Sequence, residues 1–246
     1  MKLGLELPTK VLTQLSQLTD IDFCLAQNAL EDPEYAKFFK GQSAKGRMVI
    51  LDNGFHEMGH PLSIPELEKA FGLVNPSFVV SPDWFGKPIE TFDAFQQAKK
   101  VFPKEKLAVC LAANGEIDLP QFFMNVCGEA GMLCLPYRAN RKEWFISLIH
   151  MFPRMRWPKY LHLFGMSTFD DLLYFREATI YYGWKCGDVS VDTAKPIKHG
   201  LLGKYIHEEM DLRHADISSI TLHKQIPNQA QLEACLFNIA YLRRFT

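Results

Sequence analysis

The stretch Leu107–Leu135 reads LAVCLAANGEIDLPQFFMNVCGEAGMLCL and contains the two patterns that decide the fold. Its ends, Leu107–Ala112 and Gly131–Leu135, are short and apolar, which is typical of strands buried on both faces. Between them, Leu119–Ala130 has apolar residues at helical spacing. A strand, a helix and a second buried strand in this order predict a parallel sheet that is covered by helices.

The same alternation extends outward from this stretch in both directions along the chain. No Gly-x-Gly-x-x-Gly motif opens a helix, which disfavours an open dinucleotide-binding sheet. We therefore predict one domain over residues 1–246, an α/β fold that forms a single (β/α)8 TIM barrel. The predicted strands are Lys2–Leu7, Asp22–Gln27, Met48–Leu51, Phe78–Ser81, Leu107–Ala112, Gly131–Leu135, Tyr160–Phe164 and Asp188–Val191. The predicted helices are Thr9–Leu18, Ser63–Phe71, Thr91–Val101, Leu119–Ala130, Lys142–Met151, Thr168–Tyr182 and Gln229–Arg244.

Two of these helices carry start signals in the sequence. Ser63 stands three residues before Glu66, which is the spacing of a capping box. Thr168 precedes a helical pattern with Asp171 in its first turn. From Lys195 onward we expect a polar loop, a short apolar run at Ile217–Leu222 and then the last helix.

Composition and charge favour a folded cytoplasmic protein. The chain is 48% hydrophobic and has a formal net charge of −1, so any contact with nucleic acid would depend on a local basic patch. No apolar run approaches the ~20 residues that cross a bilayer, and the first ten residues lack a signal-peptide pattern. The six cysteines show no CxxC pair, which predicts buried free thiols in a reducing compartment, without a metal or a cofactor.

Carboxylates and other polar residues follow the predicted strands, where a (β/α)8 barrel builds its active site. Two carboxylates that face one pocket can break a glycosidic bond, one as nucleophile and the other as acid and then base. A base-exchange enzyme needs the same groups, and residue types alone leave base exchange, sugar hydrolysis and aldol chemistry open. These strand-end residues are Asn28, Asp52, Asn53, Gly54, Asp83, Asn114, Gly115, Tyr137, Gly165 and Asp192.

Four segments resemble the guanine transglycosylase family, whose members exchange guanine in nucleic acid for a 7-deazaguanine. VILDNGF (Val49–Phe55) resembles the family's acidic, glycine-containing turn, and FVVSPDW (Phe78–Trp84) resembles its strand with a base-reading aspartate. YLHLFGMSTFDDLL (Tyr160–Leu173) and VSVDTAKPIKHG (Val189–Gly200) resemble its glycine-rich stretch and its nucleophile segment. The four segments also occur in the family's order.

The resemblance implies roles for particular residues. Asp192 would be the nucleophile and Asp52 the general acid and base, while Asp83 would read the guanine-type edge. Asn114 would replace a glutamine of the family, and Gly54, Phe55 and Gly165 would complete the substrate site. From their position directly after Asp192, we expect Lys195, Lys198 and His199 to contact nucleic-acid phosphates, and we expect His199 to be a surface or phosphate-contacting group and not a metal ligand.

The departures from the family pattern indicate a particular substrate. The zinc site of the tRNA-modifying members is missing, since only Cys235 follows Asp192. The chain then resembles the compact DNA-guanine transglycosylases of bacteriophages and bacterial DNA-modification clusters, which predicts insertion of a preQ0-type 7-deazaguanine into DNA, in the host cytoplasm if a virus encodes it. The alternatives are tRNA base exchange, or a non-catalytic barrel subunit that binds nucleic acid. The HEMGH sequence from His56 to His60 resembles a zinc-protease motif, but flanking glycines disfavour the helix it needs.

Overall fold

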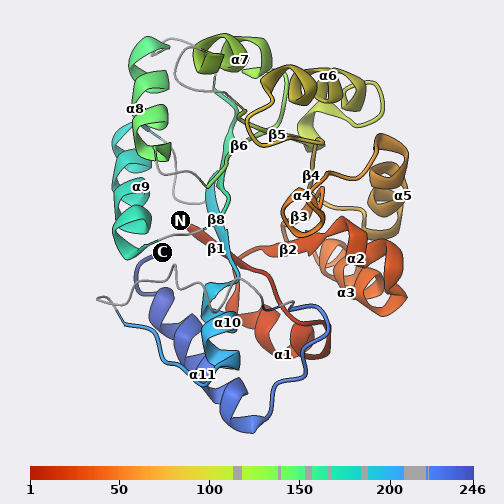
Figure 1. Cartoon of the computed structure of the whole chain (residues 1–246), viewed down its shortest axis with the longest axis vertical. Coiled ribbons are helices and arrows are strands. Elements are labelled where there is room, and N and C mark those ends of the chain that lie inside the picture. Colours follow the sequence, from red (N-terminus) through yellow and green to blue (C-terminus); the bar gives the residue numbers. More distant parts are fainter. Residues whose placement is uncertain are drawn as a thin grey trace. The chain divides into compact units, whose positions relative to one another are not determined.

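The computed structural model describes residues 1–112, 118–137, 140–152, 157–165, 168–183, 188–207, 220 and 222–246. Strands and helices alternate along the chain (Figure 1). The strands form a parallel sheet in the order β1-β8-β7-β6-β5-β4-β3-β2, so the fold class is the predicted (β/α)8 barrel. Their bounds are β1 Lys2–Leu5, β2 Asp22–Leu25, β3 Val49–Asp52, β4 Phe78–Val80, β5 Leu107–Cys110, β6 Met132–Leu135, β7 Tyr160–Leu163 and β8 Val189–Thr193.

Among the described residues, the α-helices include all those expected from the sequence and four more. Short 3-10 helices η1 (Thr9–Val11) and η2 (Ser16–Leu18) flank α1, and η3 (Lys104–Lys106) precedes β5. The α-helices are α1 Leu12–Leu15, α2 Ala26–Glu31, α3 Pro33–Ala44, α4 Phe55–Met58, α5 Ile64–Val74, α6 Pro88–Ala98, α7 Asp118–Val126, α8 Arg141–Met151, α9 Phe169–Tyr181, α10 Lys195–Leu201 and α11 Gln229–Leu242.

Contacts divide the chain into two compact units, each described by itself below. Unit 1 comprises Met1–Asp22 and Phe164–Thr246, and unit 2 comprises Phe23–Leu163. The expected single domain over residues 1–246 stays a prediction.

Unit 2 contains six strands whose side chains are almost all buried. The register pairs Ile50 with Phe78 and Cys110 with Cys134, so the neighbouring strands are parallel and in step. Carboxyl ends of these strands therefore lie along one edge. The longer helices bury one face, as α5 does with Leu67, Ala70 and Val74.

Unit 1 pairs β1 with β8 and packs α10 against α11. The Asn238 side chain, which is fully buried in α11, donates to the carbonyl oxygens of Pro196 (3.0 Å) and Lys204 (2.9 Å). Its own oxygen accepts from the Ile206 amide at 2.8 Å, so one side chain fixes the path of the chain through and beyond α10.

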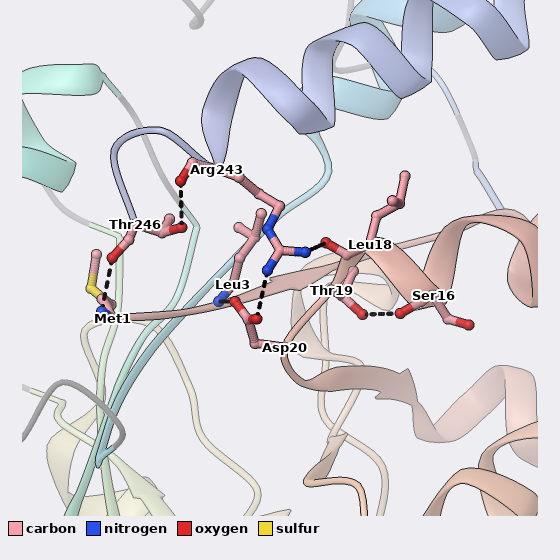
Figure 2. Close-up of polar contacts among 8 residues, drawn as sticks. All are labelled: Met1, Leu3, Ser16, Leu18, Thr19, Asp20, Arg243 and Thr246. Carbon is pink, nitrogen blue, oxygen red and sulfur yellow. Dashed lines mark hydrogen bonds and ion pairs between the residues drawn. The ribbon is translucent and has the colours of Figure 1, made fainter.

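A polar cluster joins the first and last segments of unit 1 (Figure 2). Asp20 accepts hydrogen bonds from the Leu3 amide and from Arg243, both at 2.9 Å. Arg243 also donates to the Leu18 carbonyl at 2.7 Å. The Met1 ammonium donates to a carbonyl oxygen of Thr246 at 2.8 Å. The bonds made by Arg243 and by Met1 connect residues more than 200 positions apart.

The eight predicted strands and both predicted start signals are confirmed. Glu66 accepts from the Ser63 amide at 2.9 Å, and the Asp171 amide donates to the Thr168 hydroxyl at 3.1 Å. The Ser63 hydroxyl also donates to Glu66, and these bonds lower the pKa of the Glu66 carboxyl. Cys24, Cys110, Cys134 and Cys235 are buried free thiols, as expected, whereas the free thiol Cys127 is half-buried and Cys186 lies outside the described residues.

The polar loop expected from Lys195 is wrong, because Lys195–Leu201 forms α10. Pro196 is tolerated in the first helical turn, where its missing N–H would have no helical partner. The expected apolar run at Ile217–Leu222 lies largely outside the described residues. No helix among those described is long and apolar enough to cross a membrane.

Candidate active site

The turn after β3 orients a buried carboxylate. Asp52 is the last residue of β3 and is 8% exposed. Its Oδ2 accepts a 2.9 Å hydrogen bond from the Gly54 amide, and the Asn53 Oδ1 accepts one of the same length from the Phe55 amide. Gly54 has a φ of 79°, a backbone conformation that favours glycine. The turn therefore holds the Asp52 carboxylate through main-chain bonds.

Asn53 connects this turn to the neighbouring strand. Its side-chain nitrogen donates to Asp83 Oδ1 at 2.7 Å and to the Ser81 carbonyl oxygen at 2.9 Å. Asn53 is 1% exposed, so these two bonds satisfy both donors of a buried amide group. Asn53 is thus the sequence neighbour of Asp52 and the hydrogen-bond partner of Asp83.

A thiol from the next strand completes this group. Cys110 ends β5, is 2% exposed and hydrogen-bonds to Asp83. Burial first, and then the negative charge of Asp83, raise the pKa of the Cys110 thiol well above its usual value. Cys110 is therefore a neutral thiol at pH 7 and not a nucleophile. Hereafter the acid cluster means Asp52, Asn53, Asp83 and Cys110.

Two further polar residues of unit 2 went unrecognised at the sequence level. Gln27 lies two residues after the end of β2, and its buried side chain packs against Gly54. His162 is fully buried on β7 and stacks on Phe23, with ring centroids 5.9 Å apart. The register pairs His162 with Cys134 and Cys134 with Cys110, so the three side chains project from the same face. The available signal was a polar residue within or just after an otherwise apolar run.

The remaining predicted site residues lie in unit 1, apart from Asn114, which is outside the described residues. Asp192 on β8 is 9% exposed and accepts a 3.1 Å bond from the Gly165 amide. Lys195 begins α10, where its amide donates to the Thr193 hydroxyl at 3.1 Å. The convergence of Asp192 with Asp52, and the phosphate contacts of Lys195 and Lys198, stay predictions. The surface position expected for His199 is wrong, because its side chain is fully buried in α10.

The zinc-protease motif does not form a metal site in the described part of the chain. His56 and Glu57 lie in α4, which ends at Met58, while His60 lies beyond the C-terminal cap Gly59. A single turn cannot place both histidines on one helical face. Among the described residues, no group of three or more His, Cys, Asp or Glu side chains is arranged to hold a metal ion.

The fold and this site define a class, the (β/α)8 barrels with carboxylates at the carboxyl ends of their strands. No family model matches the chain, and no curated protein matches it in sequence. Among solved structures, the N-acetylneuraminate lyase from Mycoplasma synoviae is similar, with a TM-score of 0.50, 11% identity, and coverage of 78% of this chain and 68% of that one. CdNal from Clostridium difficile, solved with mannosamine, has a TM-score of 0.49 and 12% identity over 78% and 69% of the two chains.

These comparisons overturn the resemblance to guanine transglycosylases. The similar solved structures include N-acetylneuraminate lyase, and no family model supports the transglycosylase assignment. The prediction of 7-deazaguanine insertion into DNA by a glycosyltransferase is therefore wrong. Its motifs were short strand ends with an aspartate, often followed by glycine, and such ends arise in (β/α)8 barrels generally because their sites form there. The DNA or tRNA partner stays an untested prediction.

Proposed function

We propose that this chain is a lyase that cleaves or forms the C3–C4 bond of a small 4-hydroxy-2-oxo acid. The acid cluster would move the protons. The observation that carries the proposal is the 2.7 Å hydrogen bond from the Asn53 side chain to Asp83. Asn53 is the residue after Asp52. It brings two carboxylates from adjacent strands to the edge where barrels of this class bind substrates.

Cleavage of a 4-hydroxy-2-oxo acid requires one base and one proton donor. The base takes the proton of the C4 hydroxyl, the C3–C4 bond breaks, and an aldehyde forms at C4. The bond's electron pair passes into the enolate of the other fragment, which then takes a proton at C3. A carboxylate that accepts the first proton can return it in the second step, so the proton count balances. Asp52 and Asp83 are the candidates for these two transfers.

Three features support this assignment. The Mycoplasma synoviae protein of the same fold is a lyase of N-acetylneuraminate, which is a 4-hydroxy-2-oxo acid. Asp52 and Asp83 receive hydrogen bonds from a main-chain amide and a neutral amide side chain, which stabilise a carboxylate without neutralising it. The Cys110 thiol adds a donor to Asp83 and remains protonated at neutral pH.

An imine mechanism would need a lysine amine beside the carbonyl. The described strands contain one lysine, Lys2, which lies at the amino-terminal end of β1. Lys195 lies two residues after β8. Borohydride reduction in the presence of pyruvate separates the two mechanisms, because it traps an imine as a stable mass adduct. We expect no adduct, and an adduct on Lys195 would contradict catalysis by the acid cluster.

The main test measures turnover of the purified chain and its variants. A panel of 4-hydroxy-2-oxo acids, N-acetylneuraminate among them, is followed by NMR for release of the smaller 2-oxo acid. We expect Asp52→Asn and Asp83→Asn each to lower kcat/KM by about 10²- to 10⁴-fold, the usual range for loss of a general acid or base. Asp93→Asn, at an exposed position of α6, is the matched control and should leave kcat/KM unchanged.

Two outcomes would contradict the proposal. One is a wild-type chain that turns over none of the panel. The other is activity that survives in both Asp52→Asn and Asp83→Asn, which would place the chemistry elsewhere. Circular dichroism and thermal unfolding of each variant separate lost chemistry from lost folding.

A further inference from the structure

The carboxamide of Gln27 has a buried oxygen with no hydrogen-bond partner in the described part of the chain. Gln27 is 9% exposed and is the second residue of α2, which begins immediately after β2. A buried amide oxygen without a donor is costly, because water no longer solvates it. Native proteins keep such groups mainly where a ligand, an ion or ordered water completes the bond.

The position of this oxygen connects it to the acid cluster. A Cβ atom added at Gly54 would lie 2.5 Å from Gln27 Oε1, so the carboxamide packs directly against the turn that holds Asp52. Only a glycine leaves space for it there. The absence of a side chain at Gly54 and the buried acceptor of Gln27 therefore belong to one arrangement at the carboxyl ends of β2 and β3.

A second buried polar atom lies on the other side of the same turn. Ser81 follows β4 and is fully buried, and its hydroxyl oxygen also has no hydrogen-bond partner among the described residues. Its carbonyl oxygen accepts the bond from Asn53. Partnerless polar atoms thus flank the Asp52–Gly54 turn from the two neighbouring strands, whereas the turn's own side chains are bonded.

We infer that Gln27 determines substrate specificity by accepting a hydrogen bond from a hydroxyl or N–H group of the substrate, next to Asp52. This inference rests on the proposed function for the class of substrate. It adds that the 2-oxo acid carries a donor group beyond its reacting atoms, as a hydroxylated or acylamino sugar acid does. Gln27 is a binding residue here and takes no part in proton transfer.

The inference makes two readouts move in opposite directions in Gln27→Met. Methionine keeps the length of the side chain and removes the acceptor. Because the oxygen has no donor in the described part of the ligand-free chain, we expect the melting temperature to stay the same or rise. Affinity for a donor-bearing ligand should fall by about 3- to 10-fold, as expected for the loss of one hydrogen bond.

Calorimetry on the full chain supplies the binding readout. The donor-bearing probe is N-acetylneuraminate, and the donor-free probe is pyruvate. We expect Gln27→Met to weaken binding of N-acetylneuraminate and to leave pyruvate binding unchanged. Gln42→Met, in α3 and 8% exposed, is the control matched for burial, and should bind both probes like the wild type.

Several results would overturn the inference. They are equal weakening of the binding of both probes in Gln27→Met, unchanged binding of N-acetylneuraminate in that variant, failure of the wild type to bind N-acetylneuraminate, or a melting temperature of Gln27→Met below that of the wild type. These readouts need no turnover. A chain without lyase activity that binds N-acetylneuraminate through Gln27 would therefore refute the proposed function and leave this inference standing.

Discussion

At the scale of single residues, the two glycines that flank α4 have the same backbone conformation and different surroundings. Gly54 and Gly59 cap the helix with φ of 79° and 75°. A Cβ at Gly54 would approach Gln27 and the methyl group of Met58 (2.8 Å), whereas a Cβ at Gly59 would meet nothing within 4 Å. The pair therefore separates the cost of a left-handed conformation from the cost of a steric clash.

We predict that Gly59→Ala lowers stability by about 1 kcal/mol, the cost of placing a side chain in a left-handed conformation. Gly54→Ala should cost at least about 1 kcal/mol more, since the buried Gln27 side chain and the Met58 methyl group must move. In thermal unfolding, each kcal/mol corresponds to about 2–4 °C at this chain length. Equal melting temperatures for the two variants would show that the contact between Gln27 and Gly54 is not close.

At the scale of elements, the contact between α10 and α11 explains why Lys195–Leu201 is helical. A Cβ at Gly200 would lie 2.6 Å from the backbone nitrogen of Cys235, so the helix backbones approach closely at this point. Ile197, Gly200 and Leu201 are buried. Proline and glycine weaken a helix in isolation, and packing outweighs that preference here.

Substitution of glycine by alanine should therefore have opposite signs in two helices. Gly200→Ala pushes against backbone atoms and should cost about 3 kcal/mol, the upper end for an overpacked site. Gly72→Ala lies within α5, with nothing near the added methyl group, and should stabilise by about 0.5–1 kcal/mol. Urea unfolding measures both. A stabilised Gly200→Ala variant would contradict the close approach of α10 and α11.

Helices with a local start signal were predictable, and others were not. The bonds at Ser63 and Thr168 join residues three apart, so the sequence contains them in full. Asp32 also caps α3, accepting from the Glu34 and Tyr35 amides, and Pro33 starts that helix. That Asp-Pro signal was present in the sequence but was not used to predict α3.

At the scale of the whole molecule, Asp20 and Arg243 connect parts of unit 1 that lie far apart in sequence. Their side chains are 32% and 39% exposed, which limits the value of their charge pair. Asp20 also accepts from the Leu3 amide, and Leu3 is fully buried. Removing the carboxylate would therefore leave a backbone donor without this partner.

We predict that Asp20→Ala lowers stability by about 1–3 kcal/mol, mainly through the orphaned Leu3 amide. The control is Glu34→Ala, whose ion pair with Lys37 is 4.0 Å long and joins side chains about four-fifths exposed. That variant should change stability by no more than about 0.5 kcal/mol. Differential scanning calorimetry compares the two. Equal effects would mean that the Asp20 cluster contributes nothing beyond surface charge.

The sequence by itself determined the strands, most of the helices and the order of these elements. Apolar periodicity and capping are local patterns, so they identified eight strands, most helices and the (β/α)8 class. They also predicted that Asp52 and Asp83 follow strands. Assignment to a transglycosylase failed, since short strand-end motifs reflect the architecture and not one chemistry.

Only the tertiary structure decided which side chains meet. Asn53 and Asp83 are 30 residues apart in the sequence and are joined by a hydrogen bond. Gln27 and Gly54 follow the neighbouring strands β2 and β3 and are in contact. Such distances depend on sheet register and on the path of each turn, which no local pattern specifies. The same holds for α10, whose helical state depends on packing against α11. The candidate site therefore depends on contacts between residues that are far apart in the sequence, which bury polar groups and bring backbones close together.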